Sequence, residues 1–117
     1  MLLGAAMSEP SNANGSTPNG KTLEAWRREI DAVDTEILRL LSRRATIACE
    51  LAAIKVASGL PAFDGRREQQ VLDRVSAENP GPLHSESITR IFSSIIRETR
   101  QIGTESMEKQ SSKKPRI

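Results

Sequence analysis

The sequence has few aromatic residues, a single cysteine and a single histidine. It contains one Trp, two Phe and no Tyr, and Ala, Leu, Ile, Arg and Glu dominate its middle, a composition typical of an all-helical protein. Cys49 has no second cysteine to pair with, so an internal disulfide is excluded and a reducing, cytoplasmic setting is expected.

Several sequence signatures of catalysis are also missing. One His and one Cys do not make a recognisable zinc site. The sequence contains no phosphate-binding Gly loop, no Ser/His/Asp set and no dinucleotide fingerprint. We therefore expect no metal and no cofactor, and an enzyme of this composition would act through positioning and charge.

Membrane and nucleic-acid partners are not expected either. No run approaches the roughly 18 apolar residues of a membrane span. The sequence pI near 9.0 suggests a nucleic-acid binder, but the positive excess lies at the end of the chain. Four of the 17 Lys and Arg residues, against one of the 15 acidic residues, lie in the last segment, "MEKQSSKKPRI". The rest of the chain is nearly neutral, so no broad basic face is indicated.

Composition divides the chain into three parts. Residues 1–20 are rich in Ser, Asn, Gly and Pro and are expected to be a disordered N-terminal tail. Residues 107–117 are polar and basic and are expected to be a disordered C-terminal tail. Residues 21–106 between them form the expected domain.

Three helices are predicted within that domain, and no strand pattern is found. The first runs from Thr22, a candidate N-cap, to about Ser58, where "SGLP" stops it. The second covers 64–78 and ends at "NPGP", and the third runs from His84 to about Met107. The predicted fold class is all-α, with three helices per chain and a long first helix.

The length of the first helix predicts a second chain. About 37 residues at 1.5 Å each give ~55 Å, whereas a compact domain of ~85 residues is only ~30 Å across. No Pro or Gly interrupts this helix, so a kink is not favoured. An intertwined helical homodimer, in which the partner covers the apolar stripe, is the expected assembly.

Charged residues occupy positions that should face inward. Arg44 and Lys55 lie on the apolar face of the first helix, three turns apart. In the second helix Asp64, Arg67 and Glu68 share one face. A buried charge is costly unless it is paired, so two interpretations remain open. Arg44 and Lys55 either form internal ion pairs with Asp64 and Glu68 or line a pocket for a small anionic ligand.

Arg27 is a further candidate from the first helix. It lies seventeen residues before Arg44 and ~100° away around the axis, so the two cannot share a small pocket of one chain. In an antiparallel dimer Arg27 could enter the pocket of the partner. An Arg near a helix start is otherwise most often a solvated surface charge.

Residues 23–104 resemble the AroQ class of chorismate mutase. The resemblance rests on "LEAWRREIDAVDTEILRLLSRRATIACELAAIK", "LPAFDGRRE" and "ITRIFSSIIRETR", with Arg–x16–Arg–x10–Lys followed by Asp–x2–Arg–Glu. It implies an intertwined all-helical homodimer whose two active sites use residues of both chains. The implied reaction is the cofactor-free rearrangement of chorismate to prephenate in phenylalanine and tyrosine biosynthesis.

The resemblance also implies roles for the cations. Arg44 would grip one carboxylate of the substrate, and Arg27 of the partner chain would grip a carboxylate too. Lys55 would donate to the ether oxygen, where negative charge develops as the C–O bond breaks, so Lys55 should affect turnover more than binding.

Other site residues follow from the same resemblance, with one departure. Asp64 and Glu68 would take the ring hydroxyl region, Arg67 would support the charge network, and Thr99 matches a small hydroxyl position that touches a carboxylate. One turn after Thr99 the family usually has Gln or Glu, but this chain has Gly103. Gly103→Gln is therefore expected to raise turnover.

Alternative functions are expected to use the same fold. The departure at Gly103 keeps isochorismate pyruvate-lyase and a mutase of an amino analogue of chorismate open. A non-catalytic helical dimerisation module is a third alternative, although a scaffold has no need for cations on its apolar face. A partner enzyme of the shikimate pathway is a further expectation.

Overall fold

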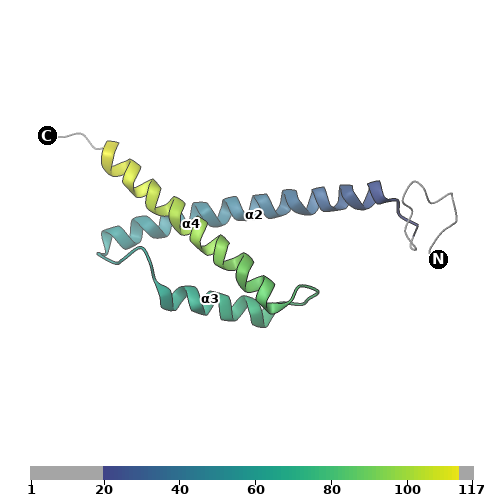
Figure 1. The fold of residues 1–117 in the computed structure, drawn as a ribbon. Coiled ribbons are helices and arrows are strands. Elements are labelled where there is room, and N and C mark those ends of the chain that lie inside the picture. Colours follow the sequence, from purple (N-terminus) through teal and green to yellow (C-terminus); the bar gives the residue numbers. More distant parts are fainter. Residues whose placement is uncertain (1–19, 114–117) are drawn as a thin grey trace. The chain divides into compact units, whose positions relative to one another are not determined.

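The computed structural model describes residues 20–113 of the 117-residue chain. Within that range it contains three helices and no strand: α2 (Leu23–Ala57), α3 (Gly65–Glu78) and α4 (Ser85–Lys113) (Figure 1). The predicted all-α class and the number of helices are confirmed for these residues. The N-terminal tail, predicted to be disordered over residues 1–20, lies outside the described residues except for residue 20.

Both ends of α2 follow the local signals in the sequence. The backbone N–H of Ala25 donates to Thr22 Oγ1 at 3.0 Å, so Thr22 is the N-cap, as predicted. After the last turn Gly59 has a φ of 70°, and the N–H of Leu60 donates to the carbonyl of Lys55 at 2.8 Å. A positive φ is readily adopted only by glycine, so Gly59 allows the chain to turn away from the helix.

The third helix is longer than expected. The carbonyl of His84 accepts the N–H of Ile88 at 3.0 Å, which places His84 at the predicted start. At the other end α4 continues to Lys113, so the predicted end near Met107 is too early. The segment "MEKQSSK" is polar but lacks Pro and Gly, and Met, Glu, Lys and Gln are good helix formers.

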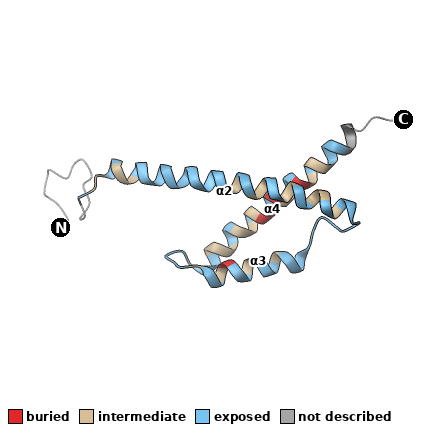
Figure 2. Ribbon diagram, turned by 180° about the vertical axis from the view of Figure 1, so that it is seen from behind, coloured by how far each residue is buried: buried red, intermediate tan, exposed pale blue. Residues whose placement is uncertain are grey.

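The chain divides into two compact units, residues 1–39 and residues 40–117. In the second unit α3 and α4 form the core (Figure 2). Its buried side chains are Val71, Val75 and Ile96, with Leu72, Ile88 and Phe92 packed against them. Val71 and Val75 are four residues apart, so one stripe of α3 faces α4. No helix among residues 20–113 is long and apolar enough to cross a membrane.

No residue of α2 is buried. In the first unit Ile30 and Val33 remain 60% and 57% exposed, and in the second unit Leu51 and Ile54 are similarly open. Figure 2 shows pale blue, exposed positions along much of this helix. An apolar stripe of this length on a single chain is typical of a surface that another chain covers.

Gly103 permits a close approach of α4 to α2 within the second unit. Gly103 is buried, and a Cβ atom there would lie 2.9 Å from the carbonyl oxygen of Ala48 and 3.3 Å from the Cβ of Ala52. These distances leave no room for a larger side chain between the two helices. This close packing argues against the expected gain of turnover in Gly103→Gln, because the Gln side chain would have to push the helices apart.

We predict that Gly103→Ala lowers the free energy of unfolding by about 1–2 kcal/mol, because an overpacking cost of about 2–3 kcal/mol against a backbone carbonyl exceeds the ~1 kcal/mol gain in helix propensity. Urea unfolding at fixed protein concentration measures the change. Ser94→Ala, at an exposed position of α4, is the control and should be neutral or slightly stabilising. A Gly103→Ala variant as stable as this control would contradict the close approach.

Candidate functional site

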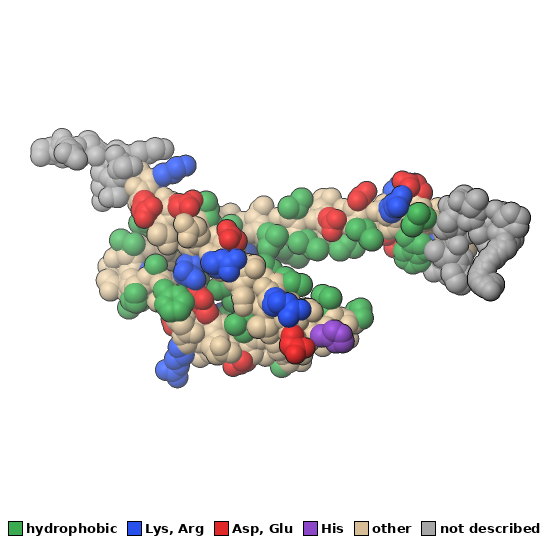
Figure 3. Space-filling model, in the orientation of Figure 1, with side chains coloured by type: hydrophobic (Ala, Val, Ile, Leu, Met, Phe, Trp, Pro, Cys, Tyr) green, Lys and Arg blue, Asp and Glu red, His purple; other side chains and the backbone are tan. Residues whose placement is uncertain are grey.

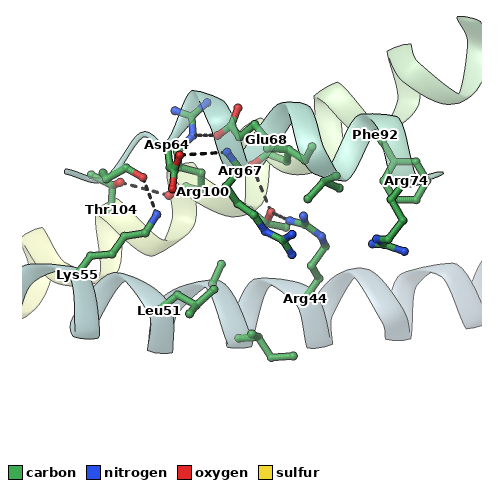
Figure 4. A pocket seen from close by; sticks show the side chains of 16 residues that line it. Arg44, Leu51, Lys55, Asp64, Arg67, Glu68, Arg74, Phe92, Arg100 and Thr104 are labelled. Carbon is green, nitrogen blue, oxygen red and sulfur yellow. Dashed lines mark hydrogen bonds and ion pairs between the residues drawn. The ribbon is translucent and has the colours of Figure 1, made fainter. Parts of the chain in front are cut away.

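Residues of α2, α3 and α4 in the second unit line an open cavity of about 320 Å³ (Figure 4). Its charged lining consists of five cations and two carboxylates: Arg44, Lys55, Arg67, Arg74, Arg100, Asp64 and Glu68. The lining therefore carries a net charge of three positive charges. The volume is that of a site for a small molecule, and the charge favours an anion.

The structure brings six of the seven predicted site residues together at this cavity. They are Arg44, Lys55, Asp64, Arg67, Glu68 and Thr99. The seventh, Arg27, belongs to the first unit, where its exposed guanidinium lies 3.7 Å from the carboxylate of Glu24 in the same helix. The proposed role of Arg27 requires a second chain and stays a prediction.

A buried hydroxyl orients Arg44. Its Nη1 donates to Oγ1 of Thr99, which is only 5% exposed. The Thr99 hydroxyl donates its own proton to the carbonyl of Ile95 at 2.7 Å, so its lone pairs face Arg44. Burial and the nearby Arg67 lower the pKa of Arg44, while Glu68 opposes that shift. A bound anion would relieve this unfavourable environment of the guanidinium.

The loop between α2 and α3 holds Lys55. Its Nζ donates to the carbonyl of Ala62 at 2.9 Å (Figure 4). An ammonium group has three N–H donors, so this bond fixes the position of Nζ and leaves two donors for a ligand. Lys55 is thus a positioned cation at one end of the cavity.

Asp64 has a structural function at the cavity rim. Its Oδ1 accepts the backbone N–H of Arg67 at 3.0 Å, which makes Asp64 the N-cap of α3. This bond explains why α3 begins at Gly65 and why Asp64 and Arg67 lie together.

The carboxylate of Glu68 is paired with Arg100. Arg100 Nε lies 2.8 Å from Glu68 Oε2, and the side chains are 31% and 23% exposed. Among residues 20–113, Glu68 forms its ion pair with Arg100. In the same range neither Arg44 nor Lys55 forms an ion pair with Asp64 or Glu68. The internal ion-pair alternative therefore fails for those four residues. In the same range no three His, Cys, Asp or Glu side chains are placed to hold a metal ion.

The cavity is also lined by three residues that were not predicted from the sequence: Arg74, Arg100 and Thr104. Arg74 lies seven residues after Arg67, so the helical repeat could have placed both on one face. Arg100 follows Thr99 directly, which is ~100° around the helix, and no spacing in the sequence marks it. Figure 3 shows basic and acidic side chains interspersed over the face of α3 and α4 in view.

These features define an all-helical domain with a small cationic ligand cavity. The family model described as chorismate mutase type II matches residues 26–104. The chain belongs to the chorismate mutase type II family.

Solved structures and a curated relative agree with this family. Chorismate mutase (form II) from Thermus thermophilus has a TM-score of 0.69 and 38% identity, covering 70% of this chain and 93% of that chain. Chorismate mutase from Helicobacter pylori, in complex with prephenate, has a TM-score of 0.68 and 32% identity, covering 74% and 93%. A bifunctional chorismate mutase/prephenate dehydratase from Neisseria gonorrhoeae is 39% identical over 72 residues. Its match covers 62% of this chain, which spans only 19% of that relative.

We predict that the Arg100–Glu68 pair contributes a coupling energy of about 1 kcal/mol to stability, because both side chains are half-buried. Unfolding of Arg100→Gln, Glu68→Gln and the double variant measures it. The Arg74–Glu78 pair, with a similar distance of 3.0 Å but side chains 55% and 65% exposed, is the matched control and should give at most about 0.5 kcal/mol. Equal coupling in the two pairs would contradict the screening of Arg100 and Glu68 from solvent.

Proposed function

We propose that this chain is a chorismate mutase, which rearranges chorismate to prephenate in phenylalanine and tyrosine biosynthesis. The observation that carries the proposal is a small cavity with three excess positive charges, in which Arg44 and Lys55 keep donors available. Chorismate is a dicarboxylate, so its charge complements the lining. The names of the relatives and the prephenate complex of the Helicobacter pylori neighbour support the same reaction.

Arg44 would hold one carboxylate of chorismate. The Thr99 hydroxyl fixes the guanidinium before substrate binds, so little side-chain freedom is lost on binding. Holding the two carboxylates favours the compact conformer in which the ends of the substrate approach each other. The rearrangement is intramolecular, so this restriction accelerates it directly.

Lys55 would donate to the ether oxygen of chorismate. Negative charge grows on this oxygen as the C–O bond breaks, so the contact strengthens in the transition state. The hydrogen bond from Nζ to Ala62 holds the ammonium group in place beforehand. Glu68 and Asp64 would lie near the ring hydroxyl, with Arg67 supporting the charge network.

A homodimer would complete each site with Arg27 of the partner chain. The exposed apolar residues of α2, including Ile30 and Val33, support such an assembly because a second copy would cover them. Arg27 would then bind a substrate carboxylate across the interface. A reducing, cytoplasmic setting fits the single cysteine, and a partner enzyme of the shikimate pathway stays a prediction.

The alternatives use the same cationic cavity and differ in product. An isochorismate pyruvate-lyase would release pyruvate, and an amino-deoxychorismate mutase would prefer an amino-substituted ring. The relatives reported above carry the name chorismate mutase, which favours the mutase. A non-catalytic dimerisation module would leave the positioned Arg44 and Lys55 without a function.

We predict that Lys55→Ala lowers kcat about 10³-fold with a smaller change in KM, because the lost contact forms mainly in the transition state. Chorismate consumption measures both constants, and circular dichroism checks the fold. Arg43→Ala removes an exposed cation of the same helix and should retain turnover. An unchanged kcat in Lys55→Ala would remove Lys55 from the mechanism.

Complementation tests the shared site. Arg27→Ala and Arg44→Ala should each be inactive, but random mixing should restore about a quarter of wild-type activity per dimer. Half of the dimers would then be heterodimers with one intact site of two. Mixing must include subunit exchange, verified by mass-tagged chains. Confirmed heterodimers without recovered activity would argue that Arg27 and Arg44 do not act in one site.

A further inference from the structure

Arg100 is held firmly at the cavity although neither the sequence pattern nor the family resemblance gives it a role. Its Nε lies 2.8 Å from Glu68 Oε2. The guanidinium carbon lies 5.1 Å from the centre of the Phe63 ring, within range of a cation–π contact. Two contacts from different segments therefore define the orientation of Arg100, and its charge lies directly beside the carboxylate (Figure 4).

The pairing uses only one oxygen of Glu68. Oε2 accepts from Arg100, and the second oxygen remains an acceptor for a ligand. Arg44 also interacts electrostatically with Glu68, but its Nη1 donates to Thr99 and it forms no ion pair with that carboxylate among the described residues. Arg100 is therefore the direct partner that compensates the negative charge of Glu68.

This compensation affects the groups that Glu68 can recognise. A carboxylate paired with a guanidinium still accepts a hydrogen bond from a neutral hydroxyl. An ammonium group meets the positive charge of Arg100 as well as the negative charge of Glu68, so its net attraction is small. Without Arg100 the attraction of this carboxylate for an ammonium group would increase, whereas its hydrogen bond with a neutral hydroxyl would change less.

We propose that Arg100 is a specificity-determining residue: by neutralising Glu68 it makes the cavity select a ring hydroxyl over a ring ammonium group. The inference rests on the proposed function, because Glu68 must face the ring substituent of a chorismate-like dicarboxylate. It assigns to Arg100 a positioning role, exerted through Glu68.

The experiment compares chorismate with 4-amino-4-deoxychorismate, in which an amino group replaces the ring hydroxyl. The full chain and its Arg100→Gln variant are assayed for kcat/KM with both compounds. A compound that is not turned over is measured by its inhibition constant against chorismate. In Arg100→Gln the preference for chorismate should fall about tenfold or more, since one charge beside Glu68 is lost.

Four further variants separate this effect from general damage. Arg100→Lys keeps the charge and should keep most of the preference. Glu68→Gln combined with Arg100→Gln removes the uncompensated carboxylate and should restore the preference toward the wild-type ratio. Arg74→Gln removes another cavity cation that is paired with Glu78, and Arg97→Gln removes an exposed cation of α4; both should leave the ratio within about threefold.

The outcomes are distinct. A structural role for Arg100 would lower kcat/KM for both compounds equally, and an unchanged ratio in Arg100→Gln would overturn the inference while the mutase proposal stands. A shift of the same size in Arg74→Gln would also overturn it, because total cavity charge would then set the preference. A folded wild-type chain that turns over neither compound would overturn the proposed function and this inference with it.

Discussion

The contact between Arg44 of α2 and the buried hydroxyl of Thr99 in α4 is the interaction on which the cavity depends. This hydrogen bond holds Arg44 at a position where the helix spacing would predict an apolar side chain. Burial, together with the nearby Arg67, lowers the pKa of Arg44. The protein therefore keeps a partly buried, unfavourable charge in the wall of the cavity. Lys55, fixed by the Ala62 carbonyl, repeats the arrangement near the end of the same helix. Both cations are positioned by neutral acceptors, so their charge stays available for an anionic ligand.

The close approach at Gly103 supports this arrangement. Because Gly103 has no side chain, α4 can lie against the backbone of α2 at Ala48, one turn after Arg44. The adjacent residue Thr104 lines the cavity instead. The departure from the family pattern at Gly103 is therefore explained by helix packing. Within the second unit, the ion pair between Arg100 and Glu68 is the charge contact that most affects the chemistry of the cavity wall.

Helix positions and most site residues could be predicted from local patterns. Thr22 and Gly59 mark the ends of α2, and the inward placement of Arg44 and Lys55 follows from the 3.6-residue repeat. The partner of Glu68 could not be predicted, because its pairing depends on how α4 lies against α3 and no sequence spacing encodes that approach. The packing of Gly103 was missed for the same reason: a missing side chain can mean a lost donor or a close contact, and only the three-dimensional arrangement distinguishes them.

We propose that the excess positive charge of the cavity serves a dicarboxylate that rearranges without a cofactor. The most direct test follows the loss of chorismate absorbance with the purified full chain and identifies the product. We expect each chorismate consumed to yield one prephenate, at a rate that is far above the uncatalysed reaction and falls as salt screens the cavity. Release of pyruvate, or a folded chain that leaves chorismate unchanged, would contradict this proposal.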